Sequence, residues 1–221
     1  MIYAVSDTHL GMGNGRDNCT SRTALEALFT EARSQDALFI MVGDILETWQ
    51  YPACGVLEYN KTLLERFLQY SGTRLILGNH DSHLVGHPFF DHPQCHSHFD
   101  AWQGGQWFRF NHGHEWDDVN NSPRPGIAQV LTILAGMAED AGWLMRLSRW
   151  WHNLKVSPRG SYRAGQIREH IIDETTGHIV CGHTHEAGSW GEYHNTGCWV
   201  DGRTDYLIID DANGGVSHHS Y

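Results

Sequence analysis

The chain has 221 residues, 40% of them hydrophobic and 19% charged, a composition typical of a globular protein that buries a substantial core and unlike that of a disordered chain. Its formal net charge of −11 argues against a general nucleic-acid binder, which needs a basic surface. The five cysteines are scattered without a C-x-x-C pair, so neither a disulfide framework nor a zinc knuckle is indicated. With no signal peptide or transmembrane stretch evident, we expect a cytoplasmic protein.

The first eighty residues alternate between short apolar runs and amphipathic stretches. The apolar runs predict strands at Ile2–Val5, Ala37–Val42 and Arg74–Leu77. Apolar residues at helical spacing predict helices at Thr20–Ser34 and Val56–Tyr70. This β-α-β-α-β order predicts an α/β fold.

The second half of the chain changes character after a histidine-rich, loop-like stretch at His80–His98. A strand is expected at Gln106–Asn111, and a long apolar helical pattern covers Pro123–Leu154. A further helix, a strand and a turn-rich second sheet are then predicted at Tyr162–Glu174, Ile179–Cys181, Gly188–Gly202 and Tyr206–Asp210. We therefore expect a single domain over residues 1–221 with a helical insertion at about 120–175.

Polar residues follow the predicted strands at the points where the strands end. Asp7 and His9 come after the first strand, Asp44 after the second, and Asn79 after the third. Sites in open α/β sheets form outside the carboxyl ends of the strands, so separate strand ends would deliver these side chains to one place. His112, His183 and His185 follow the later strands and add three imidazoles.

The resulting set of ligands contains oxygen and nitrogen but no sulfur. Such a set favours Mn²⁺, with Fe, Zn²⁺, Co²⁺ or Ni²⁺ as alternatives, over Ca²⁺ or a thiolate zinc site. Gly43 directly precedes Asp44 and would let its carboxylate approach another ligand without a Cβ in the way.

The clusters Asp7-Thr8-His9, Gly43-Asp44, Gly78-Asn79-His80-Asp81, His112-Gly113-His114 and Gly182-His183-Thr184-His185 occur in this order. Together they resemble the five motifs of the calcineurin-like metallophosphoesterases, over residues 6 to about 200. The resemblance implies a four-layer α/β/β/α sandwich and a centre of two divalent metal ions. It further implies that a metal-bound hydroxide attacks phosphorus in line.

Carried over by position, the resemblance assigns each residue a role. Asp7, His9, Asp44 and His185 would hold the first metal, and Asp44, Asn79, His112 and His183 the second, with Asp44 shared. His80 matches the family's general acid, which protonates the leaving oxygen. Glu47 stands where phosphoprotein phosphatases place the carboxylate that orients this histidine, and Asp81 is a second candidate; a solvated carboxylate at a helix start is the alternative for Glu47.

Further details are similar to the bacterial UDP-diacylglucosamine hydrolase branch: Gly43 to Trp49, His112 to Asp117, the helical insertion, and Asn195 to Trp199. That resemblance implies a phosphodiester or pyrophosphate substrate that is nucleotide- or lipid-linked, with peripheral membrane contact left open. Two positions depart from the branch, which often has Arg at the place of His80 and HGD where this chain has His112-Gly-His. His114, Arg149, Arg159 and Arg163 are candidates for substrate binding, because six of the 15 Lys and Arg cluster between residues 146 and 168.

Three other functions compete with a diesterase. One is a phosphomonoesterase, including a phosphoprotein phosphatase. Another is a non-catalytic metal-site scaffold that binds protein partners, although such proteins typically lose ligands and this chain keeps all seven. A nuclease is disfavoured by the acidic charge. The oligomeric state is left open.

Overall fold

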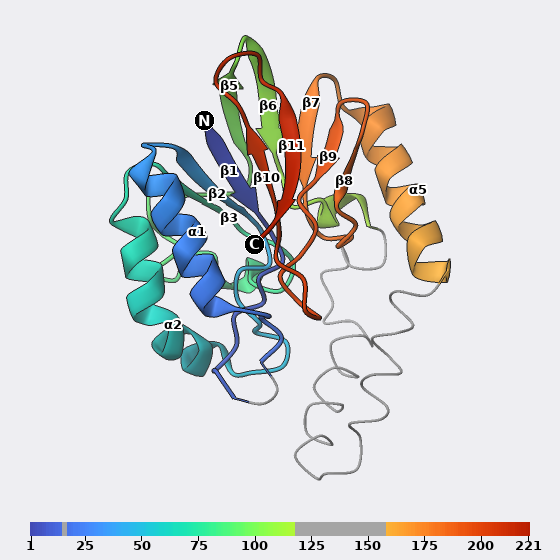
Figure 1. Cartoon of the computed structure of the whole chain (residues 1–221). Coiled ribbons are helices and arrows are strands. Elements are labelled where there is room, and N and C mark those ends of the chain that lie inside the picture. Colours follow the sequence, from blue (N-terminus) through green and yellow to red (C-terminus); the bar gives the residue numbers. More distant parts are fainter. Residues whose placement is uncertain (15–16, 118–157) are drawn as a thin grey trace.

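The computed structural model describes residues 1–14, 17–117 and 158–221, and in them two β-sheets face each other with helices on their outer sides (Figure 1). The first sheet has the strand order β11-β10-β1-β2-β3-β4, and the second has the order β5-β6-β7-β9-β8. The first comprises β1 (Ile2–Val5), β2 (Leu38–Val42), β3 (Thr73–Ile76), β4 (Cys95–His96), β10 (Asp205–Ile209) and β11 (Val216–Ser220). The second comprises β5 (Phe99–Gln103), β6 (Gln106–Phe110), β7 (His178–Cys181), β8 (Gly188–Trp190) and β9 (Tyr193–Asn195).

Helices α1 (Arg22–Ser34) and α2 (Ala53–Leu68) cover the first sheet, and α5 (Pro158–Glu174) covers the second (Figure 1). Helix α1 begins where the Ser21 hydroxyl accepts a hydrogen bond from the Ala24 amide, which satisfies one of the amides that a helix start leaves unpaired. Its apolar spacing then buries Leu25, Leu28 and Phe29 against the sheet.

Three apolar clusters lie between the four layers. Alternate residues of a strand point to opposite faces, so Tyr3 and Val5 of β1 pack toward α1 and α2, while Ile2 and Ala4 pack toward the second sheet. The cluster between the sheets also contains Phe108 of β6 and other fully or nearly fully buried side chains. A third, smaller cluster joins β7 and β9 to α5. The expected α/β/β/α sandwich is confirmed.

The direction of the strands places the loops that carry the expected ligands at one edge of the two sheets. Strands β1, β2 and β3 run parallel, with Ile2 opposite Leu38 and Phe39 opposite Thr73. In the second sheet β6, β7 and β9 also run parallel. The loops that follow β1, β2, β3, β6 and β7 carry all the residues expected to bind metal.

The expected elements of the first eighty residues are all present, with ends shifted by up to three residues. The hairpin strand β5, the edge strands β4 and β11, and the separate strands β8 and β9 were not predicted individually. Most of the expected helical insertion, including Arg149, lies outside the described residues. Among those described, no helix combines the length and apolarity needed to span a membrane.

Candidate metal centre

Seven side chains expected to bind metal converge where the two sheets meet. Strained backbone marks their loops: seven non-glycine residues of the described chain have positive φ angles, and five of these are expected ligands. The five are Asp7, His9, Asp44, His183 and His185, with φ between 42° and 66°. Such conformations cost about 1–3 kcal/mol each and persist where the surrounding structure enforces them, typically at functional sites.

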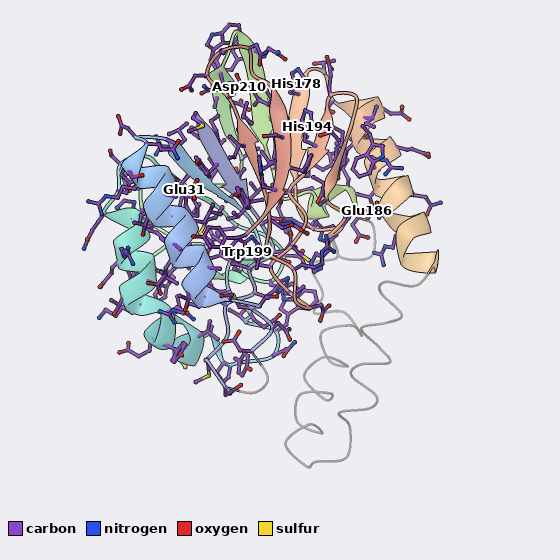
Figure 2. The ribbon with its side chains drawn as sticks, in the orientation of Figure 1. Glu31, His178, Glu186, His194, Trp199 and Asp210 are labelled. Carbon is purple, nitrogen blue, oxygen red and sulfur yellow. The ribbon has the colours of Figure 1, made fainter. Side chains whose placement is uncertain are left out.

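Glycines let the loops approach one another. Gly43 has φ of +86°, and a Cβ there would collide with the ring of His112. A Cβ on Gly182 would collide with the Asp7 carboxylate, which accepts the amide hydrogen of His183 at 2.9 Å. Trp199 is completely buried in the middle of the molecule (Figure 2). Its backbone amide donates a hydrogen bond to the Asp7 carbonyl at 3.1 Å and so fixes the loop that follows β1.

The ligands fall into two groups, each with its donor atoms within 4.8 Å of one another. One group is Asp7, His9 and His185, and the other is Asp44, His112 and His183. A third set within the same distance, His9, Asp44 and His80, shares a residue with each of them. In the first, Asp7 Oδ1 lies 3.0 Å from His185 Nε2 and 3.9 Å from His9 Nε2.

The second group includes the amide of Asn79, whose Oδ1 lies 3.2 Å from His112 Nε2. His112 is itself oriented from the other side of its ring, where Nδ1 lies 2.8 Å from the carbonyl of Val42. The two oxygens of Asp44 face different groups: Oδ1 lies 3.4 Å from His112 Nε2, whereas Oδ2 lies 3.8 Å from His9 Nε2.

Among the expected ligands in the described part of the chain, His9 Nε2 and Asp7 Oδ1 are buried atoms without a well-formed hydrogen bond, and Oδ1 faces only His185 Nε2 at 3.0 Å. Both belong to the first group, and both residues are at most 5% exposed. Because a buried polar atom without a partner is costly, its presence here fits a cation between these atoms. A mixed carboxylate, imidazole and amide set suits Mn²⁺, Fe or Zn²⁺.

The buried carboxylates and imidazoles strongly perturb each other. Burial disfavours a charged His112, but Asp44 and Asp7 outweigh that effect and raise its pKa to about 10. Burial likewise opposes charge on His9, yet Glu47, Asp44 and Asp7 raise its pKa to about 9. Burial alone would raise the pKa of Asp44, but the neighbouring imidazoles hold it well below its usual range. The carboxylate of Asp44 is therefore kept ionised.

Glu47 lies between two imidazoles and is 1% exposed, not a solvated carboxylate at a helix start. Its Oε2 is 2.9 Å from His9 Nδ1, and its Oε1 is 3.0 Å from His80 Nδ1. Oε1 also accepts the amide hydrogen of Trp49 at 3.1 Å, and the Trp49 ring stacks on His80 with centroids 3.9 Å apart. Carboxylate and indole together fix the plane of the His80 ring.

Asp81 contacts backbone rather than His80. Its carboxylate accepts the amide hydrogens of Ile45 at 2.7 Å and Gly78 at 2.5 Å, which joins the loops after β2 and β3. Burial and the nearby Asp44 raise the pKa of Asp81 to about 7. In this geometry Asp81 holds the metal loops in register, and Glu47 is the carboxylate that contacts the catalytic candidate His80.

The candidates for substrate binding lie in different surroundings. His114 packs its ring beside His112, with centroids 5.4 Å apart, and burial followed by the charge of His112 lowers its pKa to about 4. Arg163 of α5 forms an ion pair with Asp117. Arg159 lies in α5, and Arg149 falls outside the described residues.

Sequence reasoning missed the contact of Asp117 with His183 and that of Ser6 with Thr196, although it had marked the turn Asn195-Thr196-Gly197 as a possible support of the site. Asp117 Oδ2 lies 2.9 Å from His183 Nε2. The Ser6 hydroxyl donates to the Asp7 carboxylate and accepts from the Thr196 hydroxyl. Neither contact has a sequence signal of its own, because the partners are distant along the chain or are ordinary turn residues.

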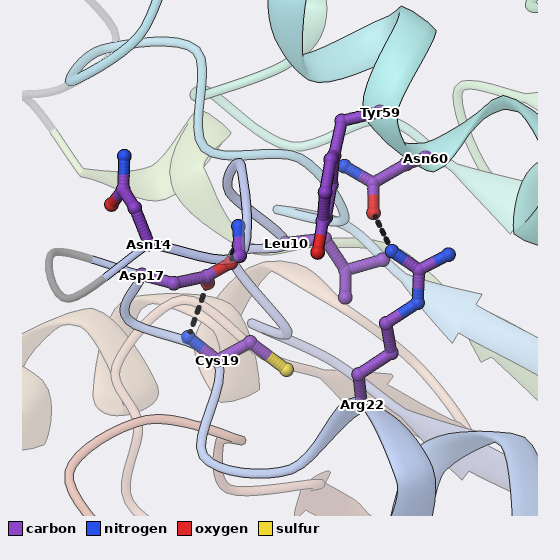
Figure 3. A pocket seen from close by; sticks show the side chains of 8 residues that line it. Leu10, Asn14, Asp17, Cys19, Arg22, Tyr59 and Asn60 are labelled. Atoms are coloured by element: carbon purple, nitrogen blue, oxygen red, sulfur yellow. Dashed lines mark hydrogen bonds between the residues drawn. The ribbon is translucent and has the colours of Figure 1, made fainter.

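A cavity of about 260 Å³ opens beside the first metal loop, close to Leu10 (Figure 3). On one side the Arg22 guanidinium lies 5.3 Å from the Tyr59 ring centroid and donates to Asn60 Oδ1 at 3.1 Å. On the other, Asp17 accepts the amide hydrogen of Cys19 at 3.1 Å. Other polar groups of the cavity bond to residues outside it: Asn14 Oδ1 accepts from the Tyr51 hydroxyl, and the Asn60 amide donates to the carbonyl of Val56.

The family model for calcineurin-like phosphoesterases matches residues 1–187, so the chain belongs to this family. The protein is therefore an enzyme, a metal-dependent phosphoesterase. The aspartate and histidine groups described above are its candidate metal ligands. No curated protein matches the chain.

Several solved structures are similar to the chain at low sequence identity. The hypothetical protein PH1004 from Pyrococcus horikoshii OT3 is 11% identical, with a TM-score of 0.50. The match covers 100% of this chain and 88% of the PH1004 chain. The phosphoesterase Yfce from E. coli is 14% identical with a TM-score of 0.44, covering 99% and 98%. Vps29 from Entamoeba histolytica, complexed with zinc, is 13% identical with a TM-score of 0.38, covering 100% and 97%.

Proposed function

We propose that the protein is a dinuclear hydrolase of phosphodiesters or pyrophosphates, with Mn²⁺ as the preferred ion. The observation that carries the proposal is the position of Asp44. Its two carboxylate oxygens face the two groups of donor atoms, one toward His112 and one toward His9. A carboxylate in this position is suited to be shared by two cations.

Asp7, His9, Asp44 and His185 would hold one ion, and Asp44, Asn79, His112 and His183 the other. Two such ions would polarise phosphoryl oxygens and lower the pKa of a water molecule toward neutrality. The chain's own part is to hold its ligands rigidly, which the strained loops and their buried hydrogen bonds support.

His80 is the proposed general acid. Because Nδ1 is engaged by Glu47, Nε2 is the nitrogen turned toward the centre, where it lies 3.9 Å from Asp44 Oδ2. A proton on Nε2 could then pass to the leaving oxygen of a substrate bound there. Trp49, stacked on the His80 ring, adds an aromatic surface beside the leaving group.

The substrate is proposed to be nucleotide- or lipid-linked, as in the UDP-diacylglucosamine hydrolase branch. The support is the similarity of the Gly43-Asp44-Ile-Leu-Glu47-Thr-Trp49 segment to that branch, while His80 is a position at which the chain departs from it. We further propose that His114, which lies beside the second ligand group, faces the substrate. The basic residues Arg149 and Arg159 remain proposed anion contacts.

The test compares Mn²⁺-loaded protein on bis-p-nitrophenyl phosphate, p-nitrophenyl phosphate and a panel of UDP-linked pyrophosphates. We expect turnover of the diester and of at least one pyrophosphate, and a strong loss in Asp44→Asn. Asp100→Asn is the matched control, because Asp100 pairs with Arg109 on the surface of the second sheet. Turnover of monoesters alone would favour the phosphomonoesterase, and no turnover with both ions bound would favour the non-catalytic scaffold.

A further inference from the structure

The contact between Asp117 and His183 settles which nitrogen of a proposed ligand is available to a metal. Asp117 Oδ2 lies 2.9 Å from His183 Nε2, and Asp117 is 3% exposed. An ionised carboxylate only accepts hydrogen bonds, so Nε2 carries the proton and donates. The lone pair of His183 is then on Nδ1, the nitrogen left to join Asp44 and His112.

Asp117 is also tied to the helix that covers the second sheet. Its second oxygen, Oδ1, accepts a hydrogen bond from the Arg163 guanidinium in α5. The neighbouring residue Trp116 makes another link, since its indole N–H donates to Glu174 at 2.9 Å near the end of the same helix. The short turn His114–Trp116 is thus anchored to α5 at two points, eleven residues apart.

We propose, resting on the dinuclear centre proposed above, that Asp117 is a positioning residue that fixes the tautomer of His183 and couples this ligand to α5 through Arg163. Residues 118–157 connect Asp117 directly to α5 in sequence. The Asp117–Arg163 ion pair therefore joins the residue before that segment to the helix after it, next to the proposed ligand His183. The proposal also gives Arg163 a role other than direct substrate binding.

The orientation of the two carboxylate oxygens permits a sharp test by substitution. In Asp117→Asn, the amide oxygen would turn to the Arg163 guanidinium, because an amide NH₂ facing a guanidinium is a repulsive pair of donors. The NH₂ would then face His183 and favour the tautomer with the proton on Nδ1. In the double variant with Arg163→Gln, the amide oxygen is free to turn back to His183.

The experiment is a calorimetric titration of Mn²⁺ into the full metal-free chain. We expect Asp117→Asn to weaken one of two binding events by about 10–100-fold, as for other carboxylates that support a metal-bound histidine. Arg163→Gln alone should have a smaller effect, and the double variant should recover part of the lost affinity. Asp100→Asn, the surface carboxylate paired with Arg109, should behave as the wild type.

A long-range ¹H–¹⁵N spectrum of the metal-free wild type provides a second readout that needs no variant. We expect neutral His183 to carry its proton on Nε2. A proton on Nδ1, or wild-type affinity for both ions in Asp117→Asn, would overturn the role of Asp117. A double variant no better than Asp117→Asn would also overturn it. A wild type that binds fewer than two ions would instead contradict the proposed dinuclear function.

Discussion

Glu47 holds His80 by a hydrogen bond of 3.0 Å to Nδ1, inside a site where the carboxylate is almost completely buried. The other oxygen of the same carboxylate holds a proposed metal ligand, His9, at 2.9 Å. A single side chain therefore orients both a ligand of the first ion and the candidate acid. Glutamate in place of a shorter aspartate provides the reach for both contacts.

Replacing Glu47 with glutamine should damage both functions of this carboxylate. One imidazole would face an amide NH₂ instead of an acceptor, so either His9 or His80 would lose its orientation. We expect kcat to fall by about 10–100-fold, with weaker binding of one ion. Steady-state kinetics and metal content check this outcome. The control is Glu65→Gln, a substitution at an exposed position of α2. A wild-type kcat in Glu47→Gln would contradict the proposed role of Glu47 in orienting His9 and His80.

The role of His80 should depend on the leaving group. A poor leaving group, such as an alkoxide, needs protonation as the bond breaks, whereas p-nitrophenolate hardly does. We expect His80→Ala to lose about 10²–10⁴-fold in kcat on alkyl or sugar-linked esters. On p-nitrophenyl esters the loss should be much smaller. An equal loss on both substrates would show that His80 does not act as the acid.

Removing metal should destabilise the folded chain, because the clustered carboxylates and the buried His9 Nε2, which makes no hydrogen bond, would lose their cation. At a free Mn²⁺ concentration one hundred times Kd, binding of each ion adds about 2.7 kcal/mol to the free energy of unfolding. That corresponds to a rise of about 5–11 °C in Tm for a chain of this size. Thermal unfolding with Mn²⁺ and with a chelator measures it, and an unchanged Tm would argue against binding.

Metal binding should release protons. The pKa values of His9 and His112 are about 9 and 10, so both imidazoles are mainly protonated at pH 8 when no cation is bound. A metal needs neutral imidazole, so we expect release of about two protons and an affinity that increases with pH. Calorimetry in buffers of different ionisation enthalpy counts the protons. Uptake of protons, or an affinity that decreases with pH, would refute this account.

A histidine away from the centre should make the fold sensitive to acid. His194, on β9, lies beside His178 of β7 (Figure 2), and its Nε2 is 3.1 Å from His178 Nδ1. Its Nδ1 is 2.7 Å from the Ser189 hydroxyl, which also contacts His218 of β11 in the first sheet. Burial, followed by the charges of His178 and His218, lowers the pKa of His194 to about 4.

The unfolded chain therefore takes up a proton at His194 near pH 6.5, while the folded chain resists it until about pH 4. The stability contributed by neutral His194 is complete above pH 6.5 and is lost as the pH falls toward 4, at up to about 1.4 kcal/mol per pH unit. Urea unfolding of wild type and His194→Gln between pH 7 and 4.5 tests this. Equal pH dependence of the two proteins would exclude the effect.

The strands and helices that the sequence predicted best are those with a strong local pattern. Ile2–Val5 and the helix at Arg22–Ser34 were expected almost at their observed bounds, because buried runs and helical spacing are local features. The strands of the second sheet have weaker patterns. Exposed Trp102 and Trp107 on the β5–β6 hairpin give no clear alternation of buried and exposed residues from their sequence alone, and neither does the mainly exposed β11 of the first sheet.

The candidate ligands, which the structure brings together, could be named from sequence because each follows a strand end, and parallel strands bring their ends together. The residues that support them could not. Whether Glu47 or Asp81 contacts His80 depends on loop conformations that place Asp81 on the amides of Ile45 and Gly78. Asp117 reaches His183 across 66 residues of sequence, and only the folded chain brings the two together.

The most direct test of the dinuclear centre is a crystal structure of the Mn²⁺-loaded protein with anomalous scattering data. We predict two anomalous peaks, one on each side of the Asp44 carboxylate. One peak should lie among Asp7, His9 and His185, and the other should contact Asn79, His112 and Nδ1 of His183. A single peak, or peaks that do not share Asp44, would contradict the account.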